Sequence, residues 1–143
     1  MPDVKEQVNE VGLELTARGI SYEYIDAFDR PAIGMAFGGG DYTFDHIAFT
    51  VAFDEDGESA QIVSSAIASV PRQKTEKLLA VLNQCNSEFR WARFYLDEDN
   101  DVIADTDVVF GEDGAGFAVV ESIMLAASVV DDAYPEIMKG IWG

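Results

Sequence analysis

Apolar residues recur at helical spacing in three segments of the chain. The first stripe repeats every three or four residues and consists of Val4, Val8, Val11 and Leu15. It predicts a helix over residues 3–18, ended by Gly19, because glycine suits the backbone at a helix C-terminus. A second helix is predicted over residues 72–89, just after Pro71, since proline is tolerated in the first turn of a helix. Its apolar stripe consists of Leu78, Leu82, Cys85 and Phe89.

The third helix is predicted from about residue 117 to about residue 140, after a loop that contains Gly111, Gly114 and Gly116. Its first half, "GFAVVESIMLAASVV", is apolar on nearly every side. A chain of 143 residues cannot easily cover such a helix on all faces. We therefore expect one face to pack on a sheet and another on a second subunit, which predicts a homodimer.

Between the helices the hydrophobic pattern changes to the alternation of β-strands. "SYEYIDAF" and "AIGMAF" predict two strands, and "DHIAFTVAF" predicts a third, joined by the turn "DEDGES" to "SAQIVSSAIAS". The residues of the third strand that point to one face are Ile47, Phe49, Val51 and Phe53. Two further strands, "RWARFYL" and "DVIADTDVVF", follow the second helix. The sequence thus predicts one α+β domain over residues 1–143, with helices on one face of a twisted antiparallel sheet and the order α-β-β-β(β)-α-β-β-α.

The charge of the chain restricts its partners. There are 27 acidic and nine basic residues, a formal net charge of −18, while 48% hydrophobic residues indicate a folded core. Such a field repels nucleic acid and anionic membranes and attracts basic protein segments, although acidity also serves solubility alone. The start "MPDVKEQVNE" lacks the apolar run of a signal peptide, and residues 115–130 form too short and interrupted a stretch to cross a bilayer. We expect a cytoplasmic protein.

The acidic stretch "FYLDEDNDVIADTDVVF" raises the question of a calcium site. Asp97, Asp99 and Asp101 have the spacing of the first ligands of an EF-hand loop. That loop requires glycine at its sixth position and glutamate at its twelfth, where this chain has Val102 and Val108. We interpret the stretch as two strands joined by an acidic turn, and leave open weak cation binding at the turn.

No set of residues predicts catalysis. His46 is the single histidine, and no cysteine or second histidine accompanies it as a zinc site would require. Cys85 lies on the apolar stripe of the second helix and is expected to be buried. The segment "GEDGAG" precedes a helix, but Glu112 and Asp113 would repel a phosphate. We predict neither an enzyme nor a cofactor.

The stretch "KLLAVLNQCNSEFRWARFYLDEDNDVIADTDVVF", together with "DDAYPEI", resembles the YbjN family, also called bacterial sensory transduction regulators. The resemblance is best over residues 74–138. It implies a fold like that of type III secretion chaperones, which are small, acidic, dimeric α+β proteins that bind extended segments of partner proteins. It supplies no catalytic motif. The best-matching positions, expected to be mostly structural, are Asn83, Phe89, Trp91, Phe94, Tyr95, Asp97, Asp105 and Tyr134.

We therefore predict a non-enzymatic protein- or peptide-binding module, chaperone-like or regulatory, that acts as a homodimer on a polypeptide partner. The candidate partner or dimer surface consists of Trp91, Tyr95, Phe117, Val120 and Met124. The alternative is a small-ligand-sensing regulatory domain with a pocket between the sheet and the helices.

Overall fold

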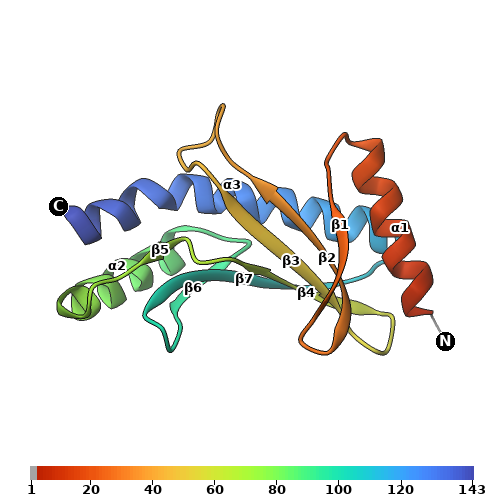
Figure 1. Ribbon diagram of the computed structural model, residues 1–143, viewed down its shortest axis with the longest axis horizontal. Coiled ribbons are helices and arrows are strands. Elements are labelled where there is room, and N and C mark those ends of the chain that lie inside the picture. Colours follow the sequence, from red (N-terminus) through yellow and green to blue (C-terminus); the bar gives the residue numbers. More distant parts are fainter. Residues whose placement is uncertain (1–2) are drawn as a thin grey trace.

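The computed structural model describes residues 3–143; the first two residues of the N-terminal segment lie outside the described residues. The helices are α1 (Val4–Ala17), α2 (Thr75–Glu88) and α3 (Gly114–Trp142), and a short 3-10 turn, Arg72–Lys74, precedes α2. Figure 1 shows α3 running along the length of the molecule, with α1 near one end and α2 near the other.

Seven strands form one antiparallel sheet, which confirms the predicted α+β class. The strands are β1 (Glu23–Ala27), β2 (Arg30–Phe37), β3 (Ile47–Phe53), β4 (Ser59–Ser64), β5 (Ala68–Ser69), β6 (Arg93–Leu96) and β7 (Asp101–Val109). The pairing runs β1-β2-β3-β4-β7, and both β5 and β6 also pair with β7. Val102 of β7 pairs with Ala68 of β5 and with Leu96 of β6, so β5 and β6 lie on opposite sides of β7. The sheet therefore ends at β1 on one side and at β6 on the other.

Two predicted elements differ from the structure. The segment "SAQIVSSAIAS" is not one strand but two, β4 and β5, because the chain leaves the ladder after Ser64. The hydroxyl of Ser64 accepts a hydrogen bond from the backbone N–H of Ala104 at 2.9 Å, in place of a backbone partner. The last helix begins at Gly114 instead of residue 117, so two of the three glycines assigned to a loop belong to its first turns.

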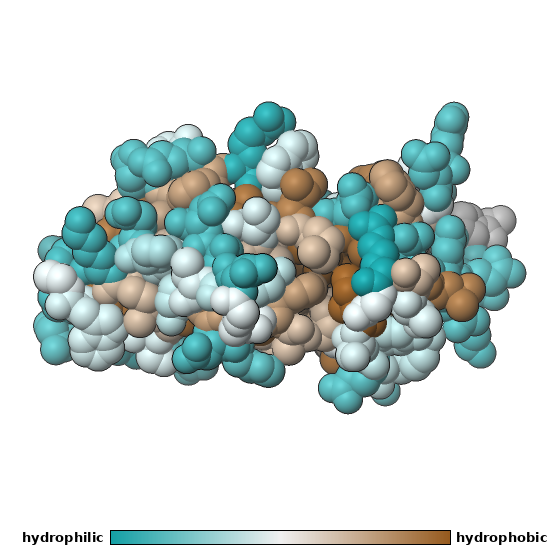
Figure 2. Space-filling view, turned by 90° about the horizontal axis from the view of Figure 1, so that it is seen from above, coloured by the Kyte–Doolittle hydropathy of each residue, from teal (hydrophilic) through white to brown (hydrophobic). Residues whose placement is uncertain are grey.

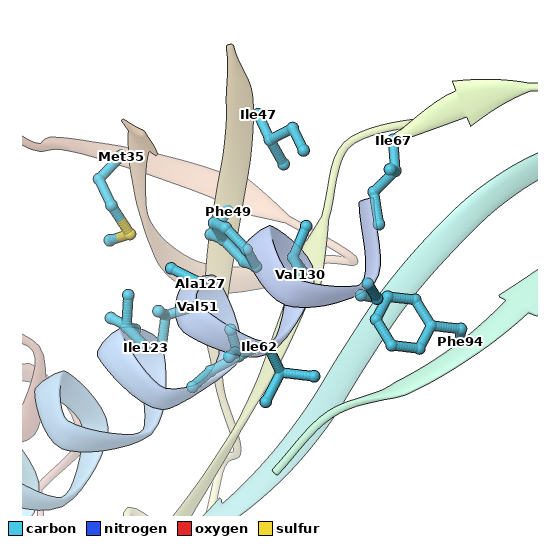
Figure 3. Packing of buried hydrophobic residues seen from close by; sticks show 14 of the residues in the cluster. Met35, Ile47, Phe49, Val51, Ile62, Ile67, Phe94, Ile123, Ala127 and Val130 are labelled. Carbon is cyan, nitrogen blue, oxygen red and sulfur yellow. The ribbon is translucent and has the colours of Figure 1, made fainter. Parts of the chain in front are cut away.

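The predicted apolar stripes form the core. Val11 and Leu15 of α1 and Leu78 and Leu82 of α2 are buried, as expected from their spacing. Figure 3 shows α3 laid over the inner face of the sheet, with its apolar side chains against those of β3 and β4. The labelled residues of this contact are Phe49, Val51, Ile62, Ile123, Ala127 and Val130, each of them buried. These side chains fill the layer between α3 and the strands β3 and β4.

The apolar helix α3 is covered mainly by its own chain. α1 packs along its first half, where the side chain of Arg18 binds the Glu121 carboxylate at 2.6 Å, and α2 packs on its second half. By length and composition α3 could cross a membrane, and half of its most apolar 18-residue window is buried within the structure. Three large apolar side chains of its first half stay exposed: Phe117, Met124 and Leu125.

Charged and apolar groups alternate over the surface. Seen from above, a band of apolar groups crosses the middle of the molecule and has hydrophilic side chains on both sides (Figure 2). Small residues dominate part of the outer sheet face, where Gly34, Ala36, Ala48 and Thr50 help to line an open hollow of about 420 Å³. The hollow has no enclosing walls of the kind that hold a small ligand.

Candidate functional site

The second half of β7 has an unpaired edge. Backbone groups of successive strand residues point to alternate sides. The carbonyl of Val102 accepts from Ile67 and the N–H of Phe110 donates to Glu58, so the even-numbered residues of β7 direct their backbone groups toward β4 and β5. The odd-numbered residues therefore point to the other side, where β6 pairs only as far as Asp105.

Asp107 and Val109 lie beyond the N-terminal end of β6, whose first residue, Arg93, pairs with Asp105. Within residues 3–143, no strand pairs with either residue on this side. Their two N–H groups and two carbonyl groups thus have no strand partner on this side, and Val109 is 77% exposed. An exposed strand edge of this kind is a template for another strand.

The conformation of Trp91 explains why β6 does not begin early enough to pair with Asp107 and Val109. Its φ angle is +75°, a left-handed conformation that is strained for a bulky residue. This conformation turns the chain away from the sheet two residues before β6 begins at Arg93. A hollow of about 390 Å³ lies between residues 91–93 and the facing part of β7. It is lined by Trp91, Ala92, Arg93, Asp105, Thr106 and Asp107. The guanidinium carbon of Arg90 lies 4.6 Å from the centroid of the Trp91 ring and packs over it.

The charged side chains at this hollow are paired with one another or packed on an aromatic ring. The guanidinium of Arg93 binds both carboxylate oxygens of the buried Asp105 and lies 3.9 Å from the Asp107 carboxylate. The hydrogen bond to Asp105, followed by the charge of that carboxylate, raises the pKa of Arg93. Burial raises the pKa of the neighbouring Tyr95, and the charges of Asp105 and Asp97 act in the same direction. The Asp107 side chain is 69% exposed and its ion pair with Arg93 is long, at 3.9 Å, so a cation of a partner can also reach its carboxylate.

Asn86 closes the outer edge of β6 itself. Its amide nitrogen donates to the carbonyl of Phe94 at 3.0 Å, and its amide oxygen accepts from the N–H of Phe94 at 2.8 Å. The side chain of an α2 residue thus replaces the next strand and protects β6 from pairing. Sequence reasoning selected Asn83, which is exposed, and missed Asn86 three residues later. The repeated spacing of leucine and asparagine, Leu82 to Asn86 as well as Leu79 to Asn83, was the available signal.

The structure separates the five predicted surface residues into two groups. Trp91 lies just before β6 and Tyr95 lies within it, with 52% and 40% of their surface exposed. Trp91 was predicted to be a strand residue, and the structure places it outside the strand. Phe117 and Met124 lie on α3, on the other side of the sheet, with 47% and 37% exposed. Val120 is fully enclosed by its own chain, because it faces the core from α3, and this removes it from any contact surface.

Three further candidate groups were considered from the sequence: the acidic turn, Cys85 and His46. The carboxylate of Asp97 accepts from the N–H groups of Asp99 and Asp101 at 3.0 and 2.9 Å, as in the predicted hairpin turn. The three carboxylates offer ligand atoms within 4.8 Å of one another. Cys85 is buried as predicted, and burial raises the pKa of its thiol. His46 is exposed next to β3.

Comparison with known protein families identifies the family of the chain. The model of the YbjN family, described as "Putative bacterial sensory transduction regulator", matches residues 13–139. No curated protein and no solved structure matches the chain. The likeness of the fold to type III secretion chaperones therefore stays a prediction.

Proposed function

Because the chain belongs to the YbjN family, we propose that it is a regulatory protein that binds an extended segment of another polypeptide and catalyses no reaction. The description of the family as a regulator supports the general role. The unpaired edge of β7 supports the mode of binding, because the N–H and carbonyl groups of Asp107 and Val109 lack a strand partner among the described residues. Strand addition supplies main-chain hydrogen bonds whatever the partner's side chains.

The charge of the protein indicates the kind of segment. A net charge of −18 opposes binding to nucleic acid or to another acidic surface. Basic segments are steered toward the protein, and salt should weaken this steering. The side chain of Trp91 offers an exposed aromatic surface at the end of the β7 edge, a residue type that is enriched in protein interfaces.

The experiment is a pull-down with the purified protein and with its Val109→Pro variant, from a lysate of the source organism, at low and at moderate salt. Proline removes the N–H that Val109 directs to solvent and is tolerated on strand edges. We expect a partner that the wild-type protein retains, that the variant loses, and that rebinds when purified. Recovery of no such partner at either salt concentration contradicts the proposed function, provided that circular dichroism shows the same fold for both proteins.

The homodimer is a separate part of this proposal, and the exposed stripe of α3 supports it. Phe117 and Met124 share one side of the helix with Glu121, whose carboxylate is already paired with Arg18, so a second copy packed there would not bury an unpaired Glu121. Met124→Glu would place a charge at the centre of the stripe. Sedimentation velocity is expected to show a dimer for the wild-type protein and a monomer for the variant; a monomeric wild type contradicts this part alone.

A further inference from the structure

The edge of β7 lies beside an uncovered flank of α3. Ser122 and Gly140 are about five helical turns apart and therefore lie on the same side of α3. At Gly140 this side is covered by α2, because a Cβ there would lie 3.0 Å from Val81. α2 does not extend to the first half of α3, where Leu125 is 39% exposed and Ala118 and Ser122 are half-buried.

The same first half of α3 lies over the second half of β7. Only residues 110–113 connect the end of β7 to the start of α3, and the two elements pack on each other. The open strand edge and the uncovered helix flank are thus adjacent. They differ in chemistry: the edge offers backbone groups and the Asp107 carboxylate, and the flank offers the apolar side chain of Leu125.

We propose that this slot takes an extended polypeptide segment, antiparallel to β7, in which basic and apolar residues alternate. This inference rests on the proposed function and specifies the sequence of the partner. Guest residues opposite Asp107 and Val109 direct their side chains to the outer face, where Asp107 is exposed. The guest residue between them points inward, next to Val108 and toward the α3 flank, and is apolar.

Charge selects a basic guest over a second copy of this chain. The carboxylates of Glu58 and Glu112 are also exposed. Of the two guanidinium groups near the slot, that of Arg93 is held by Asp105 and that of Arg90 packs over the Trp91 ring. Pairing two β7 edges would bring two Asp107 side chains together in addition to two chains of net charge −18. Lysine or arginine at the outward positions removes both penalties.

The test uses fluorescence anisotropy with a labelled, end-capped heptapeptide in which lysine and valine alternate. The comparison peptides are one with the same composition in two blocks, one with glutamate in place of lysine, and one methylated on the backbone nitrogens that face β7. We expect the alternating lysine peptide to bind about tenfold more tightly than the methylated one, since each lost hydrogen bond costs up to that factor. The alternating lysine peptide should also bind more tightly than the block peptide and the glutamate peptide.

Variants of the protein separate local recognition from general attraction. Asp107→Lys should weaken binding of the lysine peptide about fivefold and improve binding of the glutamate peptide, while Asp41→Lys, the same change in the exposed β2–β3 loop, should have little effect. Leu125→Lys should weaken both peptides, unlike Leu13→Lys on α1, where Leu13 is also exposed. Equal effects of the paired variants, or equal binding of the alternating and block peptides, overturn the inference. If the pull-down partner is still lost on Val109→Pro, the proposed function survives that result.

Discussion

Replacing Gly38 with alanine is expected to lower the free energy of unfolding by about 3 kcal/mol or more, because two penalties add. Gly38 has φ of +150°, a conformation that residues with a side chain rarely adopt. A Cβ atom at this position would also overlap the backbone carbonyl of Asp45, across the base of the β2–β3 loop. The carbonyl carbon and oxygen of Asp45 belong to the backbone and cannot turn aside as a flexible side chain could, so the loop itself must move. Urea unfolding followed by circular dichroism measures the change.

Gly39 provides the matched control. Its φ of +68° also favours glycine, but a Cβ there would meet nothing within 4 Å. Gly39→Ala should therefore cost only the left-handed backbone penalty of about 1–2 kcal/mol. Equal unfolding midpoints for the two variants would mean that the loop yields easily and that the contact with Asp45 has no energetic weight.

The loop matters because it joins the sheet to α3. The Thr43 hydroxyl lies 2.9 Å from the Asp131 carboxylate, and the ring of Phe44 is buried 6.0 Å from that of Tyr134. Hydrophobic alternation predicts β3, which follows this loop, but nothing local in the loop sequence indicates that it docks on a helix more than 80 residues later. Such contacts depend on tertiary packing rather than on the local pattern.

Periodicity predicted the elements whose apolar stripe faces one layer. The observed α1 and α2 lie within three residues of the predicted bounds, because a two-layer fold buries one side of each helix. The start of α3 was not predicted, since glycine weakens a helix by local propensity. Gly116 has a tertiary reason instead: a Cβ there would lie 2.9 Å from the backbone oxygen of Glu10 in α1. The close approach of two helices overrides the propensity of the residue.

The candidate site was less accessible to sequence reasoning than the fold. Trp91 and Tyr95 were proposed because aromatic residues occupy both faces of the predicted strand, and both side chains are exposed in the structure. The backbone edge at Asp107 and Val109 has no side-chain signature, since any residue carries N–H and carbonyl groups. The open edge exists because β6 begins only at Arg93. This in turn depends on the left-handed conformation of Trp91, which its residue type does not predict.

Phe94→Ala is expected to lower the free energy of unfolding by about 3–5 kcal/mol, as for other fully buried phenylalanines. Phe94 is 3% exposed and is the side chain that fixes β6 to the core, while Arg93 and Tyr95 point to the outer face. Without it, β6 is held by its pairing with β7, by the Arg93–Asp105 ion pair and by the hydrogen bonds from Asn86, with no buried side chain of comparable size. Chemical unfolding should show the loss of stability.

Hydrogen exchange should show where the loss acts. We expect faster exchange in β6 and at Ile103 and Asp105 of β7, whose backbone groups face β6, and little change in β3. Tyr95→Ala, on the exposed face of the same strand, should cost less than about 1.5 kcal/mol and leave exchange in β7 unchanged. If both variants lose the same free energy of unfolding, the burial of Phe94 does not determine where β6 pairs with β7. The length of the open edge at Asp107 and Val109 would then depend on the conformation of Trp91 alone.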